Sequence, residues 1–223
     1  MVIIVTGGIG SGKSEVCRII HEVYGYPVYE ADKKAKELYA RYPELVESIE
    51  RKLQCSVRDS SGMFHPALLA ERIFGDEDAL NDVESLLFPY IVSDFEDFAE
   101  SSGNIIIFES ATVLEKPFFD GFADKVILVD APREVRLRRA CERDGVAPEV
   151  VIARMNAQKL MNSVSDGTAL SIPPDTPQGR AYARIDEIII NDSSTDDLKE
   201  AVKCVMERLS SENINNKKTG SIK

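Results

Sequence analysis

The sequence has few of the residues that build metal centres and disulfide frameworks. Its 223 residues include only 4 cysteines and 2 histidines. The cysteines are scattered, with no C-x-x-C pair and no metal-ligand spacing among themselves or with the histidines: Cys17, Cys55, Cys141 and Cys204. This scatter indicates neither a zinc site nor a disulfide framework. We expect reduced thiols, as in a cytoplasmic protein.

Positive charge and long apolar runs are also scarce. The 27 Lys and Arg residues face 38 Asp and Glu residues, which gives a net charge of -11. Such a chain is not drawn non-specifically to nucleic acid or to an anionic membrane, so a few well-placed cations must capture any phosphate-bearing ligand. The first apolar run breaks at Gly7, too early for a signal peptide, and no run is long enough to span a membrane. We expect a soluble protein with small-molecule partners.

One glycine-rich segment is the most informative feature that the chain does have. Residues 6–14, Thr-Gly-Gly-Ile-Gly-Ser-Gly-Lys-Ser, fit the phosphate-loop pattern G-x-x-x-x-G-K-[ST]. The apolar run Val2–Val5 before it predicts a buried parallel strand. A helix closed by Gly25 is predicted after it, from apolar residues at helical spacing: Val16, Ile19, Ile20 and Val23. The order strand, loop, helix is the context in which this pattern binds phosphate.

The chemistry of the loop follows from its residue types. Glycines let the backbone bend so that N–H groups face phosphate oxygens, and the start of the helix adds partial positive charge. We predict that Lys13 contacts the β- and γ-phosphates of ATP and that the Ser14 hydroxyl ligates Mg²⁺. A glycine-rich turn without a ligand is the disfavoured alternative. The predicted ATP-binding residues are Gly8, Ile9, Gly10, Ser11, Gly12, Lys13, Ser14 and Glu15.

The remaining apolar segments alternate with helical ones. Strands are expected at residues 27–29, 105–108, 126–129 and 188–190. This alternation predicts an α/β fold of the P-loop NTPase type, a three-layer α/β/α core with a parallel five-stranded sheet. The predicted nucleotide-binding core comprises residues 1–32, 101–132 and 185–209.

Three further parts are expected outside this core. Residues 33–100 have little strand signal and read as a helical insertion that would bind the acceptor. Residues 133–184 are assigned to lid helices and a loop, with a helix opened by Pro132 and a long polar loop at 162–180. Thr195 is a good helix start, and residues 210–223 are predicted to be a disordered tail.

The lid segment is rich in arginine. Arg136, Arg139 and Arg143 share one helical face through their i, i+3, i+7 spacing. One interpretation is a solvated basic face that pairs with nearby acids. The other is a lid whose arginines, Arg139 and Arg143 above all, close over ATP and the transferring phosphoryl group.

Acids that follow strands are the candidates for proton transfer and metal binding. Asp32, after the short strand at 27–29, is the first choice for accepting the proton of the attacking hydroxyl, because ligands collect at the carboxyl ends of parallel strands. Its alternative role is the N-cap of a helix from Lys33 to Ala40. Glu109 is a candidate Mg²⁺ ligand, and Asp130 has the same position after its strand; either could merely cap a strand end.

Taken together, these motifs resemble the dephospho-coenzyme A kinase family. Tyr29-Glu30-Ala31-Asp32 is similar to the family element whose last aspartate is the catalytic base. Residues 139–145, Arg-Ala-Cys-Glu-Arg-Asp-Gly, followed by Ala153, Arg154 and Gln158, resemble its lid signature, and residues 188–192 resemble its closing strand. The resemblance implies transfer of the ATP γ-phosphate to the ribose 3′-hydroxyl of dephospho-coenzyme A, with Mg²⁺. It also implies a nucleotide-binding core, a helical coenzyme A part and a lid.

Two other functions stay open at this point. One is another small-molecule kinase with the same core, such as a nucleoside monophosphate kinase. The other is a nucleotide-dependent switch that hydrolyses slowly without an acceptor. The sequence has no Asn-Lys-x-Asp element for reading guanine, and an arginine-rich lid is superfluous in a passive binder, so the switch is disfavoured.

Overall fold

The computed structural model describes residues 1–158 and 175–219 of the chain. The chain forms two compact units. The first, which we call the sheet unit, comprises Met1–Val28 and Asn104–Lys223. The second, which we call the helical unit, comprises Tyr29–Gly103.

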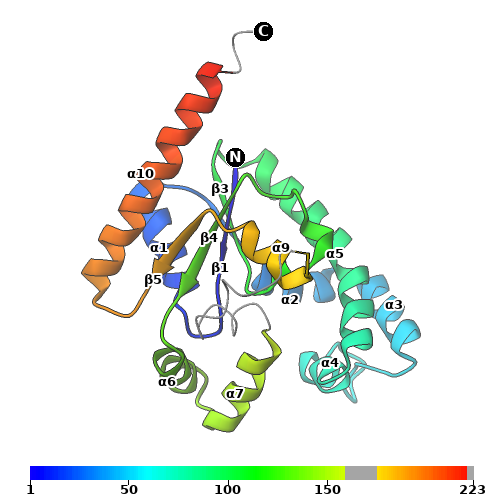
Figure 1. The fold of residues 1–223 in the computed structure, drawn as a ribbon. Coiled ribbons are helices and arrows are strands. Elements are labelled where there is room, and N and C mark those ends of the chain that lie inside the picture. Colours follow the sequence, from blue (N-terminus) through cyan, green and yellow to red (C-terminus); the bar gives the residue numbers. More distant parts are fainter. Residues whose placement is uncertain (159–174, 220–223) are drawn as a thin grey trace. The chain divides into compact units, whose positions relative to one another are not determined.

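A sheet of five strands organises the fold. In order across the sheet, the strands are β2 (Val28–Glu30), β3 (Ile106–Glu109), β1 (Val2–Thr6), β4 (Lys125–Asp130) and β5 (Glu187–Ile190). The central strand β1 pairs in parallel with both β3 and β4, and β4 pairs in parallel with β5 (Figure 1). The predicted α/β fold, with a five-stranded parallel sheet flanked by helices, is confirmed.

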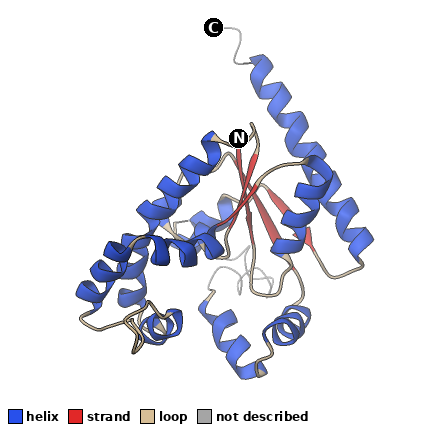
Figure 2. Cartoon of the chain, turned by 180° about the vertical axis from the view of Figure 1, so that it is seen from behind, coloured by secondary structure: helices blue, strands red, loops and turns tan. Residues whose placement is uncertain are grey.

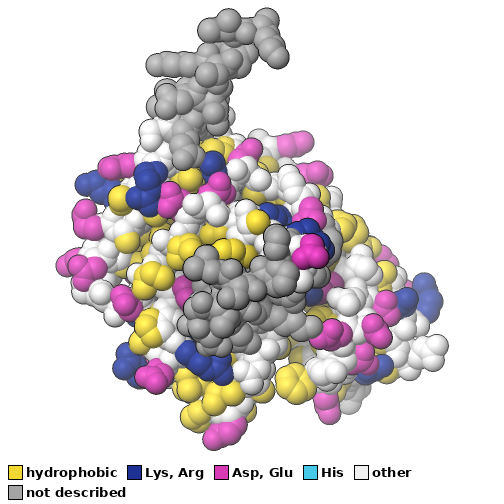
Figure 3. All heavy atoms as spheres, viewed as in Figure 1, with side chains coloured by type: hydrophobic (Ala, Val, Ile, Leu, Met, Phe, Trp, Pro, Cys, Tyr) yellow, Lys and Arg dark blue, Asp and Glu magenta, His cyan; other side chains and the backbone are white. Residues whose placement is uncertain are grey.

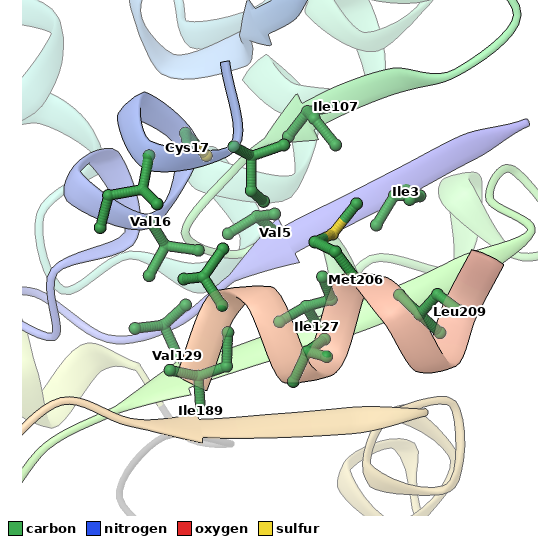
Figure 4. Packing of buried hydrophobic residues seen from close by; sticks show 14 of the residues in the cluster. Ile3, Val5, Val16, Cys17, Ile107, Ile127, Val129, Ile189, Met206 and Leu209 are labelled. Carbon is green, nitrogen blue, oxygen red and sulfur yellow. The ribbon is translucent and has the colours of Figure 1, made fainter. Parts of the chain in front are cut away.

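Two helices cover one face of this sheet, α1 (Lys13–Tyr24) and α10 (Thr195–Thr219). Alternate residues of the strands point into a shared apolar cluster, in which Met206 and Leu209 of α10 lie over Ile3 and Ile127 (Figure 4). Burying each such aliphatic side chain contributes about 1.5–3 kcal/mol. The cluster therefore fixes where β1 ends and α1 begins.

The buried stripe of α1 differs from the predicted one in its last turn. Val23 is 61% exposed, whereas Cys17 is buried. Cys17, Ile20 and Tyr24 repeat the i, i+3, i+7 spacing one residue later and all pack in the cluster. Two overlapping columns satisfy the same periodicity, and the pattern alone did not distinguish them.

The opposite face of the sheet carries aromatic packing. Phe108 of β3 packs on Phe119 and Phe122, which follow the short 3₁₀ helices at Val113–Glu115 and Pro117–Phe119. The predicted loop at 162–180 is wrong at its end, because α9 spans Pro177–Ala183. Thr176 caps this helix by accepting a hydrogen bond from the Gly179 N–H at 3.1 Å. Residues 162–174 of that predicted loop lie outside the described residues.

The arginine-rich segment forms two helices, α6 (Arg133–Asp144) and α7 (Pro148–Ala157), of which α6 starts directly after Pro132 as predicted. Ala140, Val151 and Met155 form a small core between them. Gly145, with φ of 64°, ends α6 in the left-handed conformation that glycine adopts at low cost. The helices thus pack on each other as a pair.

The described part of the helical unit contains four α-helices: α2 (Ala31–Arg41), α3 (Pro43–Leu53), α4 (Pro66–Ile73) and α5 (Glu77–Glu100). The long helix α5 contributes Val83, Leu87, Ile91 and Phe95 to the buried core. Figure 2, which colours helices blue, strands red and loops tan, shows the helices and the strands of the chain together. Between α3 and α4, residues 54–65 are not helical.

The helix α10 runs to Thr219, into the stretch for which a disordered tail was predicted. A lack of apolar residues argues against burial but not against helix, so the disordered tail stays a prediction. No Gly or Pro interrupts the chain between Thr195 and Gly220. Within the described residues, none of the helices combines the length and the apolar content that crossing a membrane requires.

Candidate functional site

The glycine loop connects the buried end of β1 to the start of α1. Gly10 and Gly12 have φ of 76° and 100°, values that residues with a Cβ rarely adopt. Gly12 is the N-cap of α1, so Lys13 and Ser14 are its first two residues and Glu15 lies in its first turn. The first N–H groups of a helix have no partner inside the helix, which makes them donors for an anion. The eight predicted ATP-binding residues therefore form one continuous turn into the helix.

The protein packs closely against one side of this loop. A Cβ atom added to any of four glycines would come within 2.1–2.2 Å of protein atoms, which no real Cβ does: Gly7, Gly8, Gly10 and Gly12. The atoms in the way belong to Val129 of β4, Arg136 of α6 and Asn191 after β5. Glycine is needed here for space as well as for backbone conformation.

Two buried amide side chains hold the loop. The Asn191 Nδ2 donates to the Ser11 carbonyl at 2.9 Å, and the Ile9 N–H donates to Gln158 Oε1 at 2.9 Å. Both side chains are more than nine-tenths buried. They satisfy backbone groups that would otherwise be buried without a partner. From the sequence, these residues were noted only as parts of family motifs, and their contacts with the loop were missed.

Ser14 and Glu109 meet at the mouth of the loop. The Ser14 hydroxyl donates to Glu109 Oε1 at 2.8 Å, and the strand register sets Glu109 beside Val5. A hydroxyl and a carboxylate are the hard oxygen donors that Mg²⁺ prefers, usually together with phosphate and water oxygens. Among the described residues, His, Cys, Asp and Glu form no group of three or more that could hold a metal by themselves. The pair therefore fits a metal shared with phosphates.

Arg136 does not lie on a basic face with Arg139 and Arg143, contrary to both sequence interpretations. Its side chain has no exposed surface. Its Nη1 faces Asp130 Oδ1 at 3.4 Å, and Asp130 ends β4 almost fully buried. Helical spacing alone did not show which face of α6 packs against the loop. The structure shows that the face with Arg136 packs there.

The two predicted lid arginines have different surroundings. Arg139 Nη1 donates to the Asn191 carbonyl at 2.9 Å, so it lies against the residue that holds Ser11. Arg143 is largely exposed and donates to Asp144 Oδ1 at 2.7 Å. This hydrogen bond lowers the pKa of Asp144. In this structure Arg139 is joined to the loop by way of Asn191, while Arg143 pairs with its own neighbour.

Asp32 belongs to the helical unit, exposed in the first turn of α2. It is not an N-cap, because the cap position is Glu30 and the helix already includes Ala31 and Asp32. The helix follows β2 without a linker, which the predicted start at Lys33 did not allow for. A carboxylate in the first turn is favourable to the helix dipole.

Acidic and basic side chains are interspersed on the face of the molecule drawn in Figure 3. With a net charge of -11, this agrees with local capture of phosphate at the loop rather than attraction by a broad field.

Comparison with known proteins points to one family. The family model described as dephospho-CoA kinase matches residues 1–165. A dephospho-CoA kinase of Porphyromonas gingivalis is 35% identical over 175 residues, 76% of this chain and 85% of the relative. One of Chlorobaculum tepidum is 32% identical over 212 residues, 92% of this chain and 93% of the relative. Among solved structures, a protein of Thermus thermophilus superposes with a TM-score of 0.71 at 26% identity, covering 94% of this chain and 97% of that one.

Proposed function

The chain belongs to the dephospho-CoA kinase family, and from this membership we propose that it phosphorylates dephospho-CoA to CoA with ATP. The observation that carries the proposal is the loop at the end of β1, which brings Lys13, Ser14 and Glu109 to one edge of the sheet in a chain that matches this family. The four free cysteines support a cytoplasmic location.

In the proposed reaction the loop binds ATP. The Ile9 and Ser11 N–H groups bond within the protein. The other N–H groups between Gly8 and Glu15 face the phosphate oxygens, and Lys13 places its ammonium on the β- and γ-phosphates. Ser14 and Glu109 would hold Mg²⁺, which supplies charge neutralisation for the phosphate groups when bound. The hydrogen bond between the two side chains supports this assignment.

The acceptor's ribose 3′-hydroxyl oxygen attacks the γ-phosphorus. The new O–P bond forms as the bond from that phosphorus to the β–γ bridging oxygen breaks, so that ADP leaves. Asp32 accepts the hydroxyl proton, as its position in the family element suggests, and the first turn of α2 holds it exposed. Arg139 and Arg143 stabilise the transferring group, residues 133–184 act as the lid, and residues 33–100 bind dephospho-CoA.

The test is acceptor-dependent turnover. Purified protein is incubated with ATP and Mg²⁺, with or without dephospho-CoA, and both ADP and CoA are quantified. We expect CoA to form in amounts equal to ADP, and little ADP without acceptor. Equal ADP release in both reactions, or phosphorylation of a nucleoside monophosphate instead, would contradict the proposed substrate.

The metal assignment has its own test. Glu109→Gln keeps the shape of the side chain and can still accept from Ser14, but it removes the charge. The Mg²⁺ concentration for half-maximal activity should rise about tenfold. Glu115→Gln is the control, because it changes charge equally on the short 3₁₀ helix that follows. If the two variants have the same Mg²⁺ dependence as the unmodified enzyme, Glu109 is not a ligand.

A further inference from the structure

Arg136 is the largest side chain in the described structure that is fully buried, and the proposed reaction gives it no task. An arginine stays protonated at any pH at which a protein is folded. Burying this charge is costly unless it is paired. Its position beside the phosphate loop therefore needs an explanation other than filling space.

Arg136 packs against the backbone of the loop. A Cβ on Gly8 would lie 2.2 Å from Arg136 Nη1 and 3.0 Å from Cζ, so the guanidinium lies directly against that glycine. A Cβ on Gly10 would lie 2.1 Å from the Arg136 carbonyl oxygen. The Ser11 N–H closes the turn on the Gly8 carbonyl at 3.1 Å. One residue of α6 thus packs against two glycines of the turn that precedes Lys13, Gly8 and Gly10.

Asp130 explains how the cation is tolerated. Its carboxylate faces Nη1 at 3.4 Å, and its side chain is 9% exposed. A role limited to neutralising Asp130 would be purely structural. The contact with Gly8 adds a second role, because the same nitrogen faces the loop backbone.

We propose that Arg136 is a positioning residue for the phosphate-binding loop, whose buried guanidinium fixes the Gly8–Ser11 turn and adds positive charge next to the nucleotide phosphates. It acts through the loop and does not touch the acceptor. The inference rests on the proposed use of ATP.

A cycle of four proteins tests it: the unmodified chain, Arg136→Met, Asp130→Asn and the double variant. Methionine approximates the length of the arginine stem without its charge, and the double variant leaves no buried carboxylate without a counter-charge. ATP affinity is measured by calorimetric titration and thermal stability by calorimetric scanning. Arg138→Met is the matched control, since it removes the same charge from an exposed position of α6.

We expect Arg136→Met to weaken ATP binding about tenfold in both backgrounds. The double variant should regain thermal stability relative to Arg136→Met but not ATP affinity. Arg136→Lys should recover part of the affinity, because it retains the charge but lacks the planar fork. In kinetics the loss should appear in the KM for ATP and leave kcat within about twofold.

Two outcomes would overturn the proposal. If Arg136→Met weakens ATP binding in the unmodified background but not alongside Asp130→Asn, Arg136 serves only to neutralise Asp130. If Arg138→Met weakens binding as much, only the net charge of α6 matters. Failure of the unmodified protein to bind ATP would instead contradict the proposed function, so the two failures are distinguishable.

Discussion

The sheet unit and the helical unit bury different kinds of side chain. Among the described residues, every buried polar or charged side chain lies in the sheet unit, near the carboxyl ends of its strands or in the segments that follow them: Thr6, Ser11, Ser110, Asp130, Arg136, Gln158 and Asn191. The buried side chains of the helical unit are aliphatic or aromatic, such as Leu45, Ile49 and Phe95. The hydroxyl of the buried Tyr29 donates to Asp94 at 3.0 Å.

This contrast shows where the molecule gives up stability for chemistry. Buried polar groups cost free energy unless each is hydrogen-bonded, whereas apolar cores stabilise with little requirement for geometry. The sheet unit concentrates that cost around the phosphate loop. The helical unit is held by packing, which leaves its exposed side chains free to serve another purpose.

Asp32 gives the strongest test of this contrast between the units, because the proposed mechanism places a catalytic group in the helical unit, which is stabilised by apolar packing. Asp32→Asn should lower turnover by about 10²–10⁴ while leaving ATP affinity unchanged, since only proton transfer is lost. Single-turnover kinetics with calorimetric ATP titration measures both quantities. Asp97→Asn, an exposed aspartate on α5, is the control. Turnover at the unmodified rate, when chemistry limits, would remove Asp32 from the mechanism.

Lys13 should give the next largest effect, this time in the sheet unit. Lys13→Ala removes the cation from the developing phosphate charge and should lower kcat/KM for ATP by about 10²–10³. Melting temperature should change little, because the side chain is partly exposed at the start of α1. Steady-state kinetics over a range of ATP concentrations checks the effect, and an unchanged kcat/KM would refute the assigned role.

Ile49 tests the other side of the contrast. Ile49→Ala leaves a cavity in the apolar core of the helical unit and should lower the free energy of unfolding by about 3 kcal/mol. ATP affinity below the melting transition should not change. Denaturant titration and calorimetry measure the two. The control is Ile188→Ala, at a partly exposed position of β5, which should lower the free energy of unfolding far less. A loss of ATP affinity in the Ile49 variant would mean that the units are not energetically separate.

The smallest effect is expected at Glu50 of the helical unit. Burial acts to raise the pKa of Glu50, but hydrogen bonds from Arg58, the Val57 N–H and Ser56 lower it overall. A lowered pKa in the folded state gives stability that is present above the unfolded value, about 4.3, and is lost as the pH falls through the folded one. Glu50→Gln should therefore cost about 1 kcal/mol at pH 7 and progressively less below pH 4. Melting temperatures across that range measure this, and a constant difference would exclude a role for the charge.

What could be predicted from the sequence was what neighbouring residues encode. The glycine loop, the strand before it, the helix after it and the helices of residues 33–100 all have local sequence signals. The structure contains each of these elements. The position of Arg136 has no local signal. The spacing of the arginines in α6 is the same whether their face of the helix is exposed to solvent or packed against protein. Arg136 is buried because α6 packs on Gly8 and Gly10, which lie far from it in the sequence.

The other missed features have similar causes. Gln158 and Asn191 lie 149 and 180 residues along the chain from the loop residues that they hold, Ile9 and Ser11. No window of sequence contains both partners. The start of α2 was misplaced because β2 leads into it directly, without the polar linker that usually marks a helix start.

The helices of the helical unit, α2 to α5, lie in the chain between β2 and β3, which are adjacent in the sheet. Parallel neighbours cannot be joined by a tight turn, because the chain must return to the starting edge of the sheet before it can run in the same direction again. The whole helical unit is therefore the return path itself, enlarged. An engineer who wished to exchange its recognition surface could replace its interior freely, but deletion down to a short hairpin would leave the edge strand β2 with no route to its neighbour.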